Sequence, residues 1–86
     1  MVIFITNKSA FKKMQDTILT LKHPVWCAPD VLTLQETNEL YKAGVELSVL
    51  DDEATTDTQA GIDTALEIIR IHHPEQEIWV EGKKLK

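Results

Sequence analysis

Four consecutive apolar residues, Val2-Ile3-Phe4-Ile5, lie at the start of the chain and decide its fold. An unbroken apolar run of this length is typical of a β-strand that is covered on both faces, as the strands of a parallel sheet are. Three further short apolar runs follow, over residues 24–28, 45–50 and 77–80. We therefore predict four strands, the first over residues 2–6 and the others over these three segments.

Between the predicted strands lie three stretches in which apolar residues recur at helical spacing. The first has its apolar stripe between Phe11 and Leu21. The second begins with the capping box Thr33-Leu34-Gln35-Glu36 and ends at Gly44, which suits the left-handed residue that follows a helix. The third covers about residues 58–71. Each stretch is long enough for a helix that connects two parallel strands.

This alternation predicts an α/β fold with a small four-stranded parallel sheet and the element order β-α-β-α-β-α-β. The compact solution is strand order 2-1-3-4, as in the first part of a flavodoxin-like or Rossmann-like sheet. In that order the first helix lies alone on one face of the sheet. One helix cannot cover four strands, so we expect a second subunit to bury part of that face or an edge strand. Residues 1–86 are expected to form a single α/β domain, because the chain has no room for a second core.

The net charge of −5 is unevenly distributed along the chain. Residues 1–43 carry five lysines and four acids, whereas residues 44–86 carry ten acids and four basic residues. Nucleic-acid binding needs a concentrated basic face, so this distribution argues against it. No apolar run approaches the roughly 20 residues that span a membrane, and no secretory leader is recognisable. We expect a cytoplasmic protein with no membrane partner.

Polar residues follow each predicted strand at the rim where open parallel sheets bind ligands. One interpretation is a Mg²⁺-dependent phosphoryl-transfer or hydrolytic site, because Mg²⁺ takes one or two carboxylates together with waters and substrate phosphates. The metal ligands would be Asp51 and Asp52, with Asp30 or Glu81 from neighbouring strands. The phosphate would meet Asn7, Lys8 and Ser9, at the start of the first helix.

The same residues also fit solvated loops and helix caps. Acids ahead of a helix interact favourably with its dipole, and adjacent Asp side chains on an extended segment point in opposite directions. Asp57 or Thr56 would cap the third helix, and Asn7 or Ser9 the first. No glycine follows the first strand, so the P-loop and dinucleotide-binding fingerprints are absent. The sequence favours loops and caps over a metal site.

Cys27 lies near the end of the second predicted strand and has no catalytic partner in this topology. A nucleophilic cysteine needs a nearby base, whereas His23, His72 and His73 fall at helix C-termini, at the opposite rim. We expect Cys27 to be a small core residue and the histidines to interact with their helix dipoles.

The sequence therefore favours a small non-enzymatic interaction module without a cofactor. It would self-associate, as a dimer, and bind a protein partner, a basic one in view of the acids. The predicted partner surface combines the end of the third strand and the third helix, with one tryptophan as an anchor: Asp51, Asp52, Glu53, Asp57, Asp63 and Trp79. The alternative is a Mg²⁺-dependent enzyme or a nucleotide-binding module that uses the strand-end rim.

Overall fold

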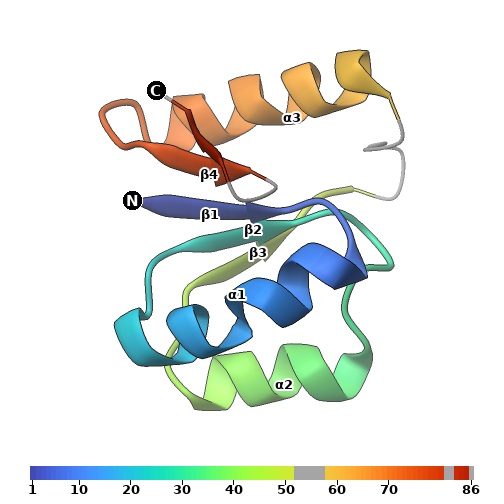
Figure 1. The fold of residues 1–86 in the computed structure, drawn as a ribbon, viewed down its shortest axis with the longest axis vertical. Coiled ribbons are helices and arrows are strands. Elements are labelled where there is room, and N and C mark those ends of the chain that lie inside the picture. The colour runs from blue at the N-terminus through green and yellow to red at the C-terminus, as the bar shows by residue number, and fades with distance from the viewer. Residues whose placement is uncertain (52–57, 81–82, 86) are drawn as a thin grey trace.

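In the computed structural model the chain has an α/β fold in three layers, with helices on both faces of one sheet (Figure 1). Residues 1–51, 58–80 and 83–85 are described, the last range by its backbone only. The predicted α/β class is confirmed. The strands are β1 (Val2–Ile5), β2 (Val25–Cys27), β3 (Leu47–Val49), β4 (Ile78–Val80) and β5 (Lys83–Leu85), and the helices are α1 (Lys8–Leu21), α2 (Leu34–Lys42) and α3 (Gln59–His72).

Four strands are parallel and lie in the order β3-β2-β1-β4, with β5 antiparallel beside β4. This order differs from the predicted 2-1-3-4, because β3 lies at an edge instead of between β1 and β4. The reason is the polar face of the β3 segment, where Glu46 is exposed and Ser48 is partly exposed. The apolar β1 takes the central position, where both faces of a strand are covered.

Helices α1 and α2 share one face of the sheet, and α3 covers the other alone (Figure 1). The prediction that the first helix lies alone is therefore wrong. The crossovers from β1 to β2 and from β2 to β3 run in the same direction, whereas the crossover from β3 to β4 returns past β1. Right-handed crossovers of opposite direction place their helices on opposite faces. The α1/α2 face buries Ile3, Ile5, Phe11, Ile18, Val25, Cys27, Leu40 and Leu47, and the α3 face buries Val2, Phe4, Leu50, Ala65, Leu66, Ile69, Ile78 and Val80.

The ends of α1 and α2 follow the local signals in the sequence. Asn7 caps α1, and its side-chain oxygen accepts a hydrogen bond from the Ala10 amide. The predicted capping box of α2 is confirmed, with Thr33 and Glu36 each accepting from the backbone N–H of the other. Gly44 follows α2 with φ of +87°, the left-handed conformation that glycine adopts without strain.

Helix α3 begins one residue later than predicted. Its N-cap is Thr58, whose hydroxyl accepts from the Gly61 amide at 3.1 Å. The predicted caps, Asp57 and Thr56, lie outside the described residues. Within the described part of the chain, none of the helices has the length and hydrophobicity of a membrane span.

Candidate functional site

A pocket of about 430 Å³ lies between β1 and the first half of α1. Strand β1 lies between β2 and β4: the chain passes from β1 to β2 on one side, and it reaches β4 on the other side later, from β3. The pocket is therefore at the point where strand order reverses, which is where open parallel sheets bind ligands. Its described lining residues are Ile3, Phe4, Ile5, Asn7, Ser9, Ala10, Lys13 and Met14.

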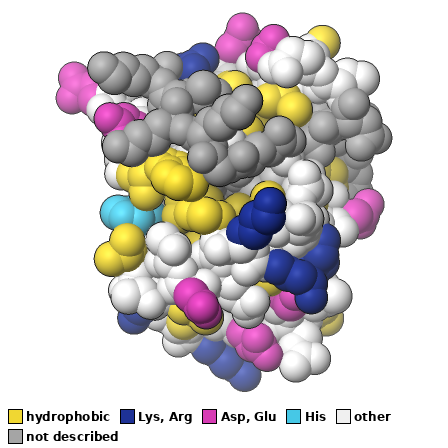
Figure 2. Space-filling view, viewed as in Figure 1, with side chains coloured by type: hydrophobic (Ala, Val, Ile, Leu, Met, Phe, Trp, Pro, Cys, Tyr) yellow, Lys and Arg dark blue, Asp and Glu magenta, His cyan; other side chains and the backbone are white. Residues whose placement is uncertain are grey.

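The lining combines an apolar floor with a polar side. Ile3 and Ile5 are 1% exposed and belong to the core on the α1/α2 face. Ser9 and Lys13 are exposed on α1 and supply a hydroxyl and an ammonium group. Figure 2 shows hydrophobic side chains beside Lys and Arg side chains on the face viewed in Figure 1. The pocket can thus hold the apolar part of a ligand and contact a polar group of it.

Two of the three predicted phosphate-binding residues line this pocket. Asn7 and Ser9 are among its residues, and the Asn7 side chain is engaged in capping α1. The Asn7 amide nitrogen also donates to the Thr6 hydroxyl at 3.3 Å. Lys8 lies elsewhere, so the phosphate-binding role of these residues stays a prediction.

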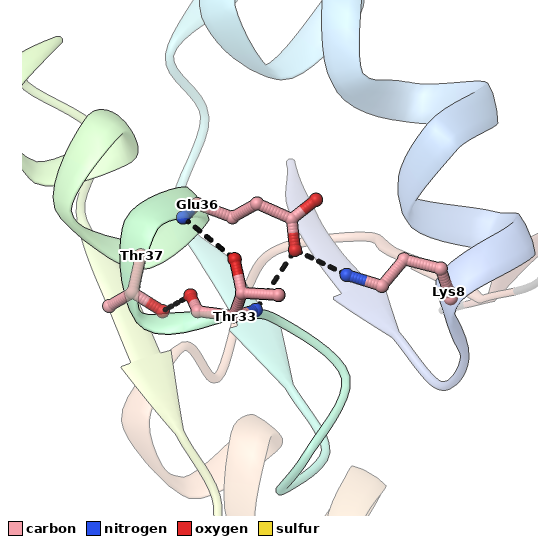
Figure 3. Close-up of polar contacts among 4 residues, drawn as sticks. All are labelled: Lys8, Thr33, Glu36 and Thr37. Atoms are coloured by element: carbon pink, nitrogen blue, oxygen red, sulfur yellow. Dashed lines mark hydrogen bonds and ion pairs between the residues drawn. The ribbon is translucent and has the colours of Figure 1, made fainter.

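Lys8 connects the N-termini of α1 and α2 (Figure 3). Its ammonium nitrogen forms an ion pair with Glu36 Oε1, the same oxygen that accepts from the Thr33 amide at 2.9 Å. The hydrogen bonds from Lys8 and from the Thr33 backbone lower the pKa of Glu36. Lys8 also lies 5.5 Å from the centre of the Phe11 ring, within cation–π distance. Lys8 is thus committed to Glu36 and Phe11.

Two of the four acids predicted to bind Mg²⁺ are among the described residues. Asp51 and Asp30 are exposed after β3 and β2, and Asp52 and Glu81 lie outside the described residues. Strands β3 and β4 are three strand spacings apart, roughly 14 Å. Among the described residues, no three His, Cys, Asp or Glu side chains are close enough to hold a metal ion. The Mg²⁺ set therefore stays a prediction.

Two acids of the predicted partner surface are among the described residues. Asp51 is exposed after the edge strand, and Asp63 is exposed on α3, where it accepts a hydrogen bond from Gln59 at 2.9 Å. Asp52, Glu53 and Asp57 lie outside the described residues. Two exposed isoleucines on α3, Ile68 and Ile71, were not among the predicted surface residues. Their positions outside the core stripe of the helix are the signal that could have identified them.

Trp79 lies on the opposite side of the sheet from Ala65, Leu66 and Ile69, the core residues of α3. It pairs in register with Ile3 on β1 and packs against the core of the α1/α2 face. Its indole nitrogen is buried and has no hydrogen-bond partner among the described residues. Trp79 and Asp63 therefore lie on opposite sides of the sheet, and their role in one partner surface stays a prediction.

The histidines at the end of α3 surround the other tryptophan, a cluster that sequence reasoning missed. The Trp26 indole nitrogen donates to His73 Nε2 at 3.2 Å, and the Trp26 and His72 rings lie 5.2 Å apart. The alternation along β2 carries the signal, because Val25 and Cys27 face α1 and α2 and Trp26 faces the other way. The cluster fixes the C-terminal end of α3 to the sheet.

Cys27 is buried in the core of the α1/α2 face, as predicted. Burial raises the pKa of its thiol to about 11. The reactive thiolate is disfavoured at neutral pH as a result. This placement agrees with a packing role.

Comparisons of this chain with protein-family models, with curated proteins and with solved structures found no significant match.

Proposed function

We propose that this chain is a protein-interaction module that self-associates and binds a basic protein partner through the outer face of α3. The observation that carries the proposal is the side chain of Ile71, which is 77% exposed on that face. An apolar side chain of this size gains free energy when a partner covers it.

The residues around Ile71 have the composition of an interface. Asp63, Glu67 and Ile71 follow one another at intervals of four, so they lie along one line of the helix. Ile68 lies beside them and is 38% exposed. An apolar centre with a charged border is the usual anatomy of a protein–protein contact. We call these four residues the α3 patch.

The sheet beside α3 supports self-association. The core of α3 packs on β1 and β4, whereas Trp26 on β2 and Ser48 on β3 stay partly exposed on this face. A second copy placed against this half of the face would bury these residues together with Ile68 and Ile71. Covering an open edge and an open face is a common reason for small sheets to dimerise.

The acids favour a basic partner. Asp63 and Glu67 are exposed in the half of the chain that carries ten acids against four basic residues. Exposed acids accelerate encounter with a basic protein and add modest affinity, and salt screens both effects. Binding should therefore weaken as the salt concentration rises.

Light scattering after size-exclusion chromatography tests self-association, with Ile71→Glu as the variant and Leu34→Glu as its matched control. Leu34 is 78% exposed on α2, so both variants place a charge at an equally exposed apolar position. We expect a concentration-dependent dimer in the parent and in Leu34→Glu, and a monomer in Ile71→Glu. A parent that stays monomeric at millimolar concentration would refute the self-association.

Cross-linking in cell extract at low and at high salt tests the partner. The expected adduct is a basic protein that is lost with Ile71→Glu and at high salt and retained with Leu34→Glu. Equal cross-linking of both variants at both salt concentrations would contradict the proposed surface.

Catalysis at the strand-end rim is the alternative function. Among the described residues, no assembled set of groups supports it, whereas the pocket supports ligand binding at this rim.

A further inference from the structure

We infer that the pocket between β1 and α1 binds a small organic anion, a molecule with an apolar body and a single phosphate or carboxylate group. This inference is independent of the α3 patch, because α1 and α3 lie on opposite faces of the sheet (Figure 1). Either one can therefore fail in experiment without affecting the other.

The size and floor of the pocket fit an apolar body. Its volume of about 430 Å³ lies in the range of roughly 300–1,000 Å³ that small-molecule sites occupy. Ile3 and Ile5 form the floor, with Ala10 and Met14, both partly buried, on the helix side. Phe4 packs its side chain on the α3 face, so it lines the pocket with backbone. A ring or a short alkyl chain would bury its surface on these groups.

The charge of the lining selects an anion. Lys13 places an ammonium group at the pocket, and no acidic side chain is among the described lining residues. The pocket also meets the first turn of α1, whose free N–H groups and dipole favour negative charge. The other lysine at this helix start, Lys8, is bound to Glu36 and leaves Lys13 as the cation of the described lining.

Trp79 lies beside the pocket on the same face of the sheet, although it is not among the described lining residues. Its register with Ile3 places it one strand away from the pocket floor and on the same face of the sheet. Its indole nitrogen is buried without a hydrogen-bond partner among the described residues, a condition that is rare for buried donors. The Trp79 indole N–H is therefore a spectroscopic reporter close to the floor of the pocket.

The turn after β1 limits the anion to one small group. A diphosphate needs glycines in this turn so that the backbone can approach it, and Thr6-Asn7-Lys8-Ser9 contains none. The Asn7 side chain also occupies the Ala10 amide as the cap of α1. The remaining donors are Ser9, Lys13 and the first N–H groups of the helix, which suffice for one phosphate or one carboxylate.

Titration of the ¹⁵N-labelled protein with three compounds tests the inference by NMR. Phenyl phosphate and phenylacetate carry a ring and one anionic group, and benzyl alcohol is a neutral control of similar size. We expect saturable shifts of the Ser9, Ala10 and Lys13 amides and of the Trp79 indole N–H with at least one anion. Benzyl alcohol should bind at least tenfold more weakly. The stronger of the two anions identifies the group that the site prefers.

Two neighbouring lysines supply the matched variants. Lys13→Ala should weaken anion binding by roughly tenfold, because it removes a charged hydrogen-bond donor. Lys12→Ala removes the same charge from an exposed position outside the pocket lining and should leave the affinity unchanged. No saturable shift with either anion, equal binding of benzyl alcohol, or equal loss in both variants would overturn the inference. Shifts of the same amides on dilution alone would also overturn it, because a second copy would then fill the pocket.

Discussion

The two faces of the sheet are covered in different ways. On one face, α1 and α2 cover β1, β2 and β3, and a pocket lined by Lys13 lies between β1 and α1. On the other face, α3 covers β1 and β4 and presents a convex surface with exposed isoleucines and acids. The direction of the crossovers decides which strands each face leaves open. A concave basic site suits a small anion, and a convex acidic helix suits a protein.

Removing a core side chain from the α3 face should have the largest effect. Ile69 is fully buried on α3, and Ile69→Ala is expected to lower the free energy of unfolding by about 2–5 kcal/mol, because it leaves a cavity. Urea denaturation followed by circular dichroism measures the change. Ile71→Ala, on the exposed side of the same helix, should stay within about 0.5 kcal/mol of the parent. Similar losses in both variants would mean that α3 is packed differently.

Loss of a helix cap should lower the free energy of unfolding less than loss of a core side chain. The size of the loss should differ between the helices on the two faces of the sheet. Thr33→Ala and Thr58→Ala each remove a side chain that accepts from a helix amide, which costs about 1 kcal/mol. Thr33 belongs to a reciprocal capping box that also orients the partner of Lys8, so its loss should cost more. The same urea experiment compares the two variants. A larger loss for Thr58→Ala would contradict the proposed importance of the Thr33 box.

The smallest effect on the free energy of unfolding should come from acidification, which breaks the ion pair between Lys8 and Glu36 on the α1/α2 face. The pKa of Glu36 is lowered in the folded protein, so its contribution to stability is complete above the unfolded pKa and is lost as the pH falls through the folded pKa. Glu36→Gln retains an acceptor for the Thr33 amide without the charge. Between neutral and acidic pH, the free energy of unfolding of Glu36→Gln should fall less than that of the parent. The difference should be under about 1 kcal/mol, because the ion pair is partly exposed.

Urea unfolding at a series of pH values measures this difference. Glu39→Gln serves as the control, because Glu39 is exposed on the same helix and pairs with Gln35. The parent and Glu39→Gln should show the same acid dependence. An unchanged acid dependence in Glu36→Gln would show that the pair with Lys8 does not contribute to folding.

Local signals in the sequence determined the helices and strands but not their arrangement. The capping box at Thr33 and the left-handed Gly44 are encoded by residues close in sequence, and both were predictable. Strand order depends on pairing between distant segments, such as Val2 with Ile78. The polar face of β3, with Glu46 and Ser48, carried the information that this strand lies at an edge.

The candidate site was predictable only in part for the same reason. Asn7 and Ser9 were identified from their position after the first strand, and both line the pocket. Lys8 was grouped with them, but it pairs with Glu36 because α1 and α2 lie side by side on one face. The pocket lies between β1 and α1, and only the strand order shows that this is the point where the order reverses. Strand β5 has no alternating pattern that would have predicted it.

The central position of β1 also has a consequence for the order of folding. β1 is synthesised well before β4, yet β4 completes its second edge. The N-terminal half can form its β1-α1-β2-α2-β3 unit from nearby segments, and until β4 arrives the open edge of β1 presents unpaired backbone groups to any other strand. A chain released before residue 78 would therefore retain an unpaired apolar strand edge and be prone to aggregate.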